Sequence, residues 1–426
     1  MDTIFALSSG SPPAGIAVVR ISGPRSGAAL VALTSKKLPI PRMADLANLC
    51  DPRKGTPLDR ALTLWFPGPN SVTGENIVEL HLHGGRAVVA AVLNVLTQFD
   101  GLRHAEPGEF TRRAFENGRI DLAEAEGLAD LLSAETEAQR RSAIAQVGGS
   151  LHRLTEEWTK QLLALSARVE AAIDFSDEYD VADTVIDSIN AEVSSIVADI
   201  EQKIANPPAE RLRDGLRVAI LGPPNSGKST LLNKLISREA AIVSDIPGTT
   251  RDVIEAPVTF GGVQLTFIDT AGIRHDAADL VEQIGISRSR REGRTADIIL
   301  ALGGWRDPES AAVVLAVTTK ADLIDGEATG LKVSAHTGEG MAELYEAITA
   351  AASACLPAPD QVALTLRHRT ALRKACSALS IIAGEQDELI VAEILRVALL
   401  AVGEVTGGAD AEDMLDVLFG SFCIGK

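Results

Sequence analysis

The sequence predicts a multidomain protein that combines an α+β domain, a helical bundle domain and an α/β domain. Its 426 residues, 46% of them hydrophobic and 23% charged, suffice for two or three globular domains. Short apolar runs broken by glycine and proline fill the first part, and apolar residues at helical spacing follow. Residues 206–208 and 356–359 are rich in proline and enclose a segment in which strands and loops alternate.

Composition excludes several classes of protein. A net charge of -18 argues against a protein that coats nucleic acid, because such binding needs a basic surface to displace counterions from phosphates. Any RNA partner must therefore be held locally or with help. The four cysteines show no C-x-x-C spacing, so neither a disulfide framework nor a zinc site is indicated; they are Cys50, Cys355, Cys376 and Cys423.

Targeting and membrane signals are not expected either. The first residues lack a cationic segment followed by an apolar one, which a secretory signal requires. The longest comparable apolar stretch, residues 87–99, has 13 residues and is too short to span a bilayer. We therefore expect a cytoplasmic protein without a membrane partner.

The order of the elements follows from these patterns. Residues 3–118 carry short apolar runs at 16–19 and 61–66 between glycine and proline turns, which predicts a compact α+β domain with a helix over 86–98. From Ile144 to Ile173 apolar residues recur every three or four positions, as in one buried helical stripe. This region is expected to form long helices packed as a bundle.

Helical spacing returns after Pro357 and Pro359, in residues 363–382, 388–402 and 411–422. The simplest interpretation is an insertion, with an α/β domain over about 216–355 lodged in a helical domain built from both flanking arms.

The inserted segment begins with a phosphate-binding motif. A buried strand at 216–221 runs into GPPNSGKS at 222–229, which matches G-x-x-x-x-G-K-[ST] in its required context. Glycines let backbone N–H groups surround phosphates, Lys228 reaches the outer phosphates, and the Ser229 hydroxyl is a Mg²⁺ ligand at the start of a helix over 230–236. The candidate nucleotide-binding residues here are Asn225, Ser226, Gly227, Lys228, Ser229 and Thr230.

A second loop, SDIPGTTRD at 244–252, suits a segment ordered by the γ-phosphate and Mg²⁺. Thr250 would supply the second Mg²⁺ oxygen. An ordinary connection between strands is the alternative interpretation. The candidates are Ser244, Asp245, Ile246, Pro247, Gly248, Thr249 and Thr250.

A third loop follows a strand at 263–268 and consists of Asp269, Thr270, Ala271 and Gly272. Asp269 can hold Mg²⁺ through water, and the Gly272 N–H can sense the γ-phosphate. Ile273 stands where many GTPases have a glutamine that orients water, so another group must complete hydrolysis. The nearby candidates, each of which could also be a solvated loop charge, are Arg274, His275, Asp279 and Glu282.

Base selection is assigned to the loop after a strand at 312–318. Asp322 can accept both N–H groups of the guanine edge, a contact that adenine cannot make. Thr319 stands where GTPases usually have asparagine, which leaves specificity to Asp322. The base-reading candidates are Thr319, Lys320, Ala321 and Asp322, with Ser334, Ala335 and His336 closing over the base. Together the loops predict a Ras-like P-loop domain that binds GTP and GDP and hydrolyses GTP.

One connection in this domain is short. Only nine residues separate the predicted strand 297–302 from the strand that starts at 312, while a crossover between parallel strands usually takes a dozen or more. We expect the helix there to be shortened or absent.

Motifs outside the nucleotide loops identify a family. They are VRISG at 19–23, WFPGPNS at 65–71, TGE at 73–75, HGG at 83–85, PGEFT at 107–111, AAIDF at 171–175 and FCIGK at 422–426. With the nucleotide loops, they resemble the tRNA modification GTPase family known as MnmE or TrmE over essentially the whole chain.

The resemblance implies four segments. Residues 1–118 would bind folate and dimerise, 119–213 and 357–426 would form the helical domain with its terminal Cys-Ile-Gly-Lys, and 214–356 would be the inserted GTPase domain. The homodimer would work with the FAD-containing partner MnmG (GidA), in a heterotetramer or larger complex. Together they would add an aminomethyl or carboxymethylaminomethyl group to C5 of the wobble uridine, position 34, of tRNA. The partner could carry much of the contact with tRNA.

The resemblance also implies how hydrolysis is completed. The two GTPase domains of a dimer would meet, with K⁺ at the nucleotide in place of an arginine finger; such a cation offsets charge on the leaving group. Its ligands would be the Asn225 side chain and oxygens of Ser244, Ile246 and Thr249. Glu282 aligns with the family's water-activating glutamate, so the catalytic candidates are Glu282, Lys228 and Thr250.

For 5-formyl- or methylene-tetrahydrofolate, the resemblance points to Arg20, Glu79, Arg119 and Lys426. A carboxylate could pair with the pterin's amino edge and cations could hold the glutamate tail. Arg20 and Glu79 could instead form a structural salt bridge in the dimer. Cys423 fits a thiol near the folate site better than a prenylation box, because glycine and lysine follow in the tail.

A second class of function stays in view: a regulatory or ribosome-assembly GTPase that binds RNA without modifying it. That class predicts an appended basic RNA-binding module, and none is visible in the sequence. A structural protein with a vestigial GTPase domain conflicts with the intact Lys228, Ser229, Thr250 and Asp269.

Overall fold

The computed structural model describes residues 2–174, 182–239, 255–268, 293–305, 311–324, 330–358, 361–407, 412–420 and 422–425. The chain forms two compact units. The first contains Met1–Ala129, Gln146–Thr159 and Val402–Lys426, and the second contains Asp130–Ala145 and Lys160–Ala401.

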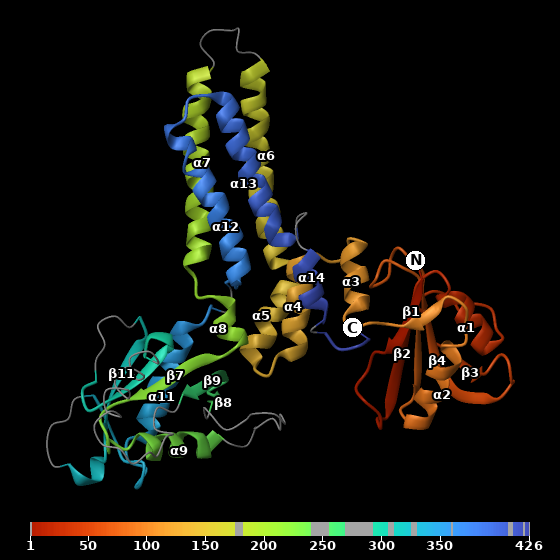
Figure 1. Cartoon of the computed structure of the whole chain (residues 1–426), viewed down its shortest axis with the longest axis horizontal. Helices are drawn as coiled ribbons and strands as arrows, with labels where there is room; N and C mark the ends of the chain where they lie inside the picture. The colour runs from red at the N-terminus through yellow and green to blue at the C-terminus, as the bar shows by residue number, and fades with distance from the viewer. Residues whose placement is uncertain are drawn as a thin grey trace. The chain divides into compact units, whose positions relative to one another are not determined.

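A six-stranded sheet forms the centre of the first unit, with strand order β3-β4-β5-β2-β1-β6 (Figure 1). All neighbouring pairs are antiparallel except β1 and β6. The strands are β1 (Thr3–Leu7), β2 (Ile16–Ser22), β3 (Asp45–Cys50), β4 (Pro57–Phe66), β5 (Ile77–His83) and β6 (Leu102–His104).

One face of this sheet is apolar and buried. Along β2, Ala17, Val19 and Ile21 alternate with more exposed residues and pack in one core with α1 (Ser26–Thr34) and α2 (Arg86–Leu96). This alternation is the signature of an antiparallel sheet with one covered face. The predicted helix over 86–98 is therefore present and ends slightly earlier.

Three helices complete the unit: α3 (Glu109–Glu116), α4 (Leu122–Ser133) and α14 (Glu412–Gly420). Phe419 and Phe422 pack with Leu122 in a small core. The end of the chain then returns to the sheet region, where Ile424 pairs with Pro107 in an isolated antiparallel bridge. The C-terminal segment is thus an integral part of this unit.

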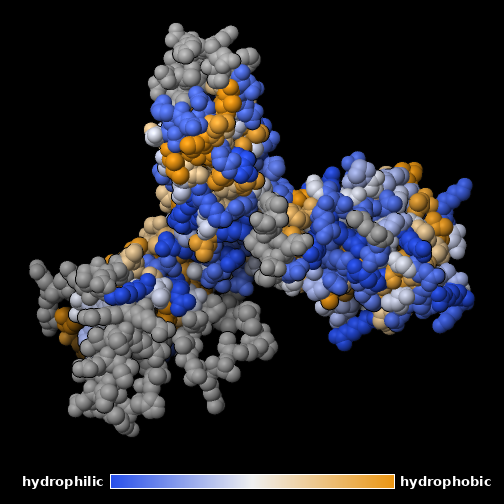
Figure 2. All heavy atoms as spheres, turned by 45° about the horizontal axis from the view of Figure 1, so that its top comes forward, coloured by the Kyte–Doolittle hydropathy of each residue, from blue (hydrophilic) through white to orange (hydrophobic). Residues whose placement is uncertain are grey.

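Long helices dominate part of the second unit. Figure 1 shows α6, α7, α12 and α13 side by side, and Figure 2 shows apolar side chains gathered on their surface. The helices of this region, three of which (α5, α6 and α13) have residues in the first unit, are α5 (Glu137–Val147), α6 (Ser150–Asp174), α7 (Ala182–Ala205), α8 (Ala209–Arg213), α12 (Leu366–Leu379), the 3₁₀ turn η2 (Ile382–Gly384) and α13 (Glu388–Thr406).

The remainder of the second unit is an α/β fold around a sheet with order β12-β11-β10-β7-β9-β8. Its pairs are parallel except β8 with β9. A core of strand residues packs with α9 and α11. The elements are β7 (Leu216–Leu221), α9 (Lys228–Glu239), β8 (Glu255–Phe260), β9 (Val263–Ile268), β10 (Ile298–Leu302), β11 (Val313–Thr319), η1 (Ala321–Leu323), β12 (Leu331–Val333) and α11 (Met341–Cys355).

The fold class predicted from the sequence is confirmed, and one detail of the helical region differs. The apolar stripe that starts at Ile144 is divided between α5 and α6, because Gly149 has φ +73° and ends the run. Ile144 itself is 47% exposed, while Trp158 and Leu162 are buried. The buried apolar stripe therefore lies mainly on α6 and only to a small extent on α5.

The short crossover lies between β10 and β11, which are parallel neighbours. The described residues of this connection, 303–305 and 311–312, contain no helix. Residues 306–310 lie outside the described part of the chain, so the expected shortening of this connection stays a prediction there. Within the described residues, no helix is long and apolar enough to cross a membrane.

Candidate nucleotide-binding site

The phosphate-binding motif forms the turn between β7 and α9. β7 ends at Leu221 and α9 begins at Lys228, so the loop opens directly onto a helix N-terminus. Asn225 (φ 60°) and Gly227 (φ 86°) have left-handed backbone conformations. A Cβ on Gly222 would lie 2.7 Å from the Leu302 Cβ, so glycine is needed for the loop to pass β10.

The polar groups of this loop suit an anionic ligand. The Lys228 Nζ donates to the carbonyl oxygens of Gly222 and Pro223, each at 2.9 Å, which holds the ammonium group across the loop. The Ser226 Oγ is buried and has no hydrogen-bond partner among the described residues. Ser229, in the first turn of α9, is exposed. A hydroxyl without a described partner, in a loop that carries an ammonium group and leads into a helix N-terminus, fits a phosphate ligand.

The base-reading loop is hydrogen-bonded to the phosphate loop. Thr319, at the end of β11, donates through its Oγ1 to the carbonyl oxygen of Ser226 at 2.5 Å. The next residue, Lys320, donates through its Nζ to the carbonyl oxygen of Asn225 at 2.9 Å. Thr319 therefore supplies one contact to the phosphate loop even without an amide. Because the strands are parallel, their carboxyl ends place both loops at one edge of the sheet.

The two predicted base-contacting loops also meet. The pKa of the Asp322 carboxyl is lowered, chiefly by a hydrogen bond from Ser334 and further by the charge of His336. Ser334 is 1% exposed, and its Oγ also accepts a bond from the Thr337 N–H at 3.2 Å. The hydrogen bond from Ser334 joins the two loops and favours the ionised form of Asp322, which is the form that accepts two N–H donors.

The other loops cannot be placed in this geometry. The candidates Ser244, Asp245, Ile246, Pro247, Gly248, Thr249, Thr250, Asp269, Thr270, Ala271, Gly272 and Glu282 lie outside the described residues. Asp269 follows directly on Ile268, which pairs with Ala219 of β7. That loop therefore starts on the strand next to the one that carries the phosphate loop.

Comparisons with known proteins cover nearly the whole chain. Residues 3–119 match the family model "GTP-binding protein TrmE N-terminus", and residues 122–423 match the model "MnmE helical domain". A protein named tRNA modification GTPase MnmE from Novosphingobium aromaticivorans is 51% identical over 439 aligned positions that cover 100% of both chains.

The chain belongs to the MnmE family of tRNA modification GTPases.

Other relatives with the same name agree. The protein from Rhizorhabdus wittichii is 52% identical and covers 100% of this chain and 97% of its own length. The one from Erythrobacter litoralis is 52% identical over 100% of both chains. Among solved structures, the G domain of the T. maritima FeoB iron transporter covers 32% of this chain and 98% of its own, with 26% identity and a TM-score of 0.24.

Two of the folate candidates, Arg20 and Glu79, lie on the sheet face opposite α1 and α2. Arg20 and Glu79 are cross-strand partners in β2 and β5, and two hydrogen bonds of 3.1 and 2.8 Å join them. The Arg20 guanidinium also lies 5.8 Å from the centre of the Phe110 ring. This salt bridge forms within one chain and needs no dimer. Arg119 is exposed, and Lys426 lies outside the described residues.

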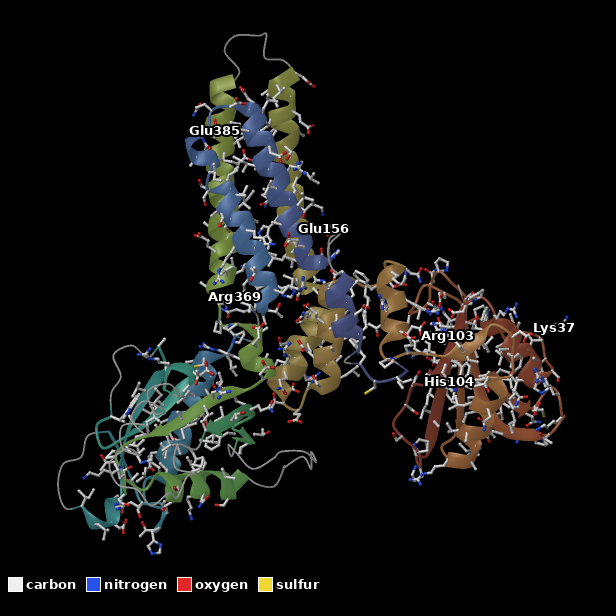
Figure 3. The ribbon with its side chains drawn as sticks, in the orientation of Figure 1. Lys37, Arg103, His104, Glu156, Arg369 and Glu385 are labelled. Carbon is white, nitrogen blue, oxygen red and sulfur yellow. The ribbon has the colours of Figure 1, made fainter. Side chains whose placement is uncertain are left out.

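Sequence reasoning gave no role to an ionic network in the same region. Arg113 of α3 donates to both Glu75 carboxylate oxygens at 3.1 and 3.2 Å, to Glu109 at 2.9 Å and to Asp2 at 2.7 Å. Arg103, labelled in Figure 3, donates two bonds of 2.8 and 2.6 Å to Glu109. Glu75 and Glu109 belong to the family motifs TGE and PGEFT. These motifs were the only indication in the sequence that the two carboxylates matter.

The network holds its carboxylates ionised. Burial alone would raise the pKa of Glu109, but bonds from Arg103, the Glu106 N–H and Arg113 lower it below the ordinary value. The pKa of Asp2 is lowered in the same way, since Arg103 and Arg113 outweigh burial. These two motifs therefore have a structural role, joining the chain's start to α3 and the 73–75 loop.

A second contact missed from the sequence joins α5 to the α/β fold. The Gln139 side chain is 8% exposed. Its Nε2 donates to the Leu212 carbonyl at 3.0 Å and to the Gln264 Oε1 at 2.9 Å. Its Oε1 accepts from the N–H groups of Glu135 and Thr136, both at 2.9 Å. One buried amide thus links a helix start, the segment before β7 and the strand β9.

Proposed function

We propose that this chain binds and hydrolyses GTP, and that hydrolysis serves C5 modification of the wobble uridine of tRNA together with an FAD-containing partner of the MnmG (GidA) kind. One observation carries the proposal. The phosphate loop and the base loop are joined through Thr319 and Ser226, in a chain 51% identical along its length to a relative named tRNA modification GTPase.

The described residues divide the work of nucleotide binding. Lys228, Ser226 and the N-terminus of α9 would hold the phosphates, with Asn225, Gly227 and Thr230 completing the loop. Asp322 would accept the guanine N–H groups, held by Ser334 and beside His336. Adenine lacks the matching pair of donors, so discrimination would come from the unpaired carboxylate that an adenine nucleotide leaves behind.

Cations would support hydrolysis. Ser229 and Thr250 would bind Mg²⁺, with Asp269 acting through water, and Asn225, Ser244, Ile246 and Thr249 would bind K⁺. Mg²⁺ and K⁺ supply positive charge where negative charge develops on the transferring phosphoryl group. Glu282 would position and activate the attacking water. Of these residues, Ser229 and Asn225 are described, and both are exposed beside the phosphate loop.

Folate binding is assigned to Arg20, Glu79, Arg119 and Lys426. The Arg20 and Glu79 pair offers a guanidinium and a carboxylate about 80% withdrawn from solvent, which suits a polar heterocycle such as the pterin of 5-formyl- or methylene-tetrahydrofolate. The chain's end lies on this unit, through the pairing of Ile424 with Pro107, so the exposed Cys423 belongs to the same region.

Dimerisation through the N-terminal domain is supported by the same sheet face. Ile16 (62% exposed), Leu46 (47%) and Leu62 (44%) all lie on the side opposite the α1 and α2 core. Exposed apolar residues gathered on one sheet face are characteristic of a protein interface. We assign residues 1–118 to this domain, 119–213 and 357–426 to the helical domain, and 214–356 to the GTPase domain.

Nucleoside analysis of total tRNA from a deletion strain tests the pathway. We expect the C5-modified wobble uridines to be lost, restored by the native gene, and not restored by a Lys228→Ala variant. Unchanged tRNA in the deletion strain would overturn the proposal.

The GTPase rate of purified protein in K⁺ should exceed the rate in Na⁺. Equal rates in the two salts would contradict the cation-assisted mechanism.

A further inference from the structure

Helix α12 is the centre of a basic segment in an acidic chain. Residues 361–384 contain no aspartate or glutamate, although the whole chain has 58 acidic and 40 basic residues. The cations of this segment are Arg367, Arg369, Arg373 and Lys374. Because residues 361–384 contain no carboxylate side chain, the negative charge that balances these cations must come from another part of the chain or from a ligand.

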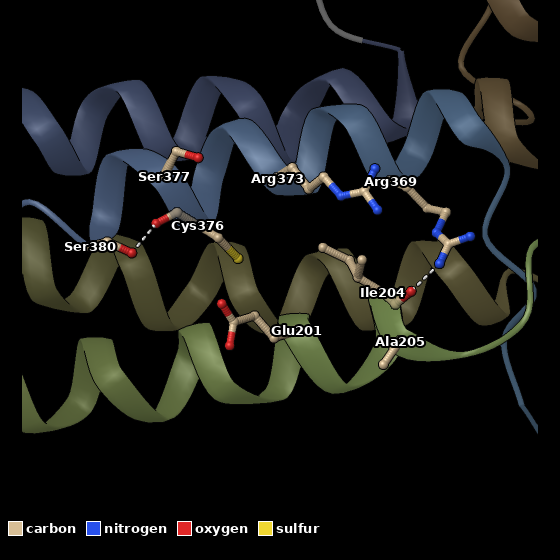
Figure 4. A pocket seen from close by; sticks show the side chains of 8 residues that line it. All are labelled: Glu201, Ile204, Ala205, Arg369, Arg373, Cys376, Ser377 and Ser380. Carbon is tan, nitrogen blue, oxygen red and sulfur yellow. Dashed lines mark hydrogen bonds between the residues drawn. The ribbon is translucent and has the colours of Figure 1, made fainter. Parts of the chain in front are cut away.

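Two of these arginines line a groove between α12 and α7 (Figure 4). The groove has a volume of about 460 Å³, enough for a phosphate group and its neighbouring sugar. Its walls are Glu201, Ile204 and Ala205 from α7, and Arg369, Arg373, Cys376, Ser377 and Ser380 from α12. Arg369 and Arg373 are four residues apart and so lie on the same side of the helix.

The guanidinium groups have unused hydrogen-bonding capacity. Arg369 donates through its Nη2 to the carbonyl oxygens of Ile204 and Asn206. Its Nε is buried and has no partner among the residues that the structure describes. Arg373 is exposed, and no hydrogen bond or ion pair joins it to another described residue. A buried donor left unbonded costs free energy unless a ligand uses it.

The two arginines also repel each other. The pKa of Arg369 is lowered, first by burial and next by the positive charge of Arg373. Two cations at this spacing destabilise a helix, and an anion between them would reverse that effect. The arrangement of Arg369 and Arg373 is therefore expected to be more stable with an anion bound between them than without one.

The one carboxylate of the groove does not fill this role. Figure 4 places Glu201 beside Cys376. There the pKa of the thiol is raised to about 11, first by burial and then by the charge of Glu201. Cys376 is thus a neutral thiol at physiological pH and adds no second negative charge. At Arg369 the charges of Glu210 and Arg211 act on the pKa in opposite directions, so the Arg369 and Arg373 end of the groove stays positive.

We propose that this end of the groove binds a backbone phosphate of the tRNA substrate. The proposal rests on the proposed function and adds a contact site to it. Planar guanidinium groups match the oxygens of a phosphodiester in a bidentate way, and the exposed Ser377 offers a hydroxyl donor beside them. Such contacts position a nucleic acid without reading its sequence. A local site of this kind is what an RNA-binding chain with a charge of -18 requires.

Arg373→Ala tests the site, because Arg373 makes no described contact that folding would miss. The binding constant of purified full-length protein for unmodified substrate tRNA is measured at several KCl concentrations. We expect affinity to fall by roughly ten-fold and the slope of log K against log[salt] to decrease by about 0.9, the value for one lost phosphate contact in a duplex. The GTPase rate without tRNA should stay unchanged.

Two variants provide the comparison. Arg396→Ala removes an exposed arginine of α13 that pairs with Glu393 at 2.6 Å, and it should alter neither affinity nor slope. Arg373→Lys keeps the charge but not the bidentate fork, so the slope should be preserved while affinity falls by a smaller factor.

The outcomes separate the two proposals. If the native chain binds tRNA and Arg373→Ala binds it with the same affinity and salt slope, the groove proposal is wrong and the proposed function stands. If Arg373→Ala instead weakens only the association with the flavoprotein partner, the groove is a protein contact and the RNA proposal is also wrong. If the native chain with its partner shows no affinity for tRNA, the proposed function itself fails.

Discussion

The N-terminal ionic network and the nucleotide-binding loops handle charge in opposite ways. In the network, Arg113 is 10% exposed and bonds to carboxylates of Asp2, Glu75 and Glu109. In the nucleotide site, Lys228 and Lys320 donate to neutral backbone carbonyl oxygens, and the buried Ser226 Oγ has no described partner. The first region balances its charges internally, while the second holds cationic donors that a bound anion could use.

This difference separates residues that stabilise the fold from residues that bind a ligand. A buried ion bonded on all sides is expensive to disrupt, because removal of one partner leaves the other uncompensated. A donor held on neutral oxygens can exchange them for phosphate at little loss of stability. Variants in the two regions should therefore separate stability from nucleotide binding.

The largest effect is expected for Arg113→Ala. Loss of this guanidinium leaves Glu75 and Glu109 with fewer partners in a buried site, so the free energy of unfolding of the N-terminal unit should fall by about 3–5 kcal/mol. GTP affinity should not change. The neighbouring Arg112→Ala is the matched control, because Arg112 is 38% exposed and pairs with exposed carboxylates; it should cost about 1 kcal/mol or less. Denaturant unfolding with a fluorescence probe measures both, and equal losses would contradict the distinction.

Lys228→Ala is expected to have the next largest effect, and it should change GTP hydrolysis while leaving the stability of the fold nearly unchanged. The GTPase rate should fall by about 10²–10³-fold, since an electrostatic donor to the phosphates is lost. The thermal unfolding midpoint of the nucleotide-free protein should barely move. Lys234→Ala on the same helix, α9, provides the control and should leave the rate intact. A folded Lys228→Ala protein with a normal GTPase rate would show that this loop does not bind the phosphates of GTP.

The network also predicts a pH dependence. The pKa of Glu109 is lowered in the folded protein, so its contribution to stability is complete above the ordinary value of 4.5 and is lost as pH falls through the lower folded-state value. Glu109→Gln should cost about 1.5–3 kcal/mol at pH 7. Against native protein, that difference should shrink towards zero under strongly acidic conditions. A difference independent of pH would mean that Glu109 acts through packing and not through charge.

Thr319→Ala should have the smallest effect. It removes the hydrogen bond to the Ser226 carbonyl, which is worth about 1 kcal/mol, and GDP affinity should fall about five-fold. Thr319→Asn, the residue usual in GTPases, should restore the contact and bind at least as tightly. Isothermal titration with GDP distinguishes the two, and equal affinity for Thr319→Ala and the native protein would show that this bond does not organise the site.

The strands that lead into the candidate nucleotide loops were largely predictable from the sequence, because each has a clear apolar run. The strands over 216–221 and 263–268 were predicted with the bounds that the structure has. Asp322 and Ser334 were assigned to one site across a gap in the chain, and the structure brings them together. The hydrogen bond from Thr319 to Ser226 was not anticipated, because a threonine hydroxyl gives no sequence signal of its acceptor.

The N-terminal network shows where sequence reasoning failed. Glu75 and Glu109 were recognised as parts of motifs, but their shared partner Arg113 lies outside both motifs and meets them only through tertiary packing. Gln139 was missed for the same reason, since its acceptors at Leu212 and Gln264 are far away in the chain. Local patterns identify strands and loops, while partners of buried polar groups depend on the fold.

The most direct test of the account is the base preference of the purified protein before and after Asp322→Asn. Equilibrium titration with GDP, ADP and XDP should show binding of GDP by the native protein, negligible binding of ADP, and a change of preference towards XDP in the variant, because the exchanged amide can donate where the carboxylate accepted. Equal affinity of the native protein for GDP and ADP, or no affinity for either, would contradict the proposed function at its centre.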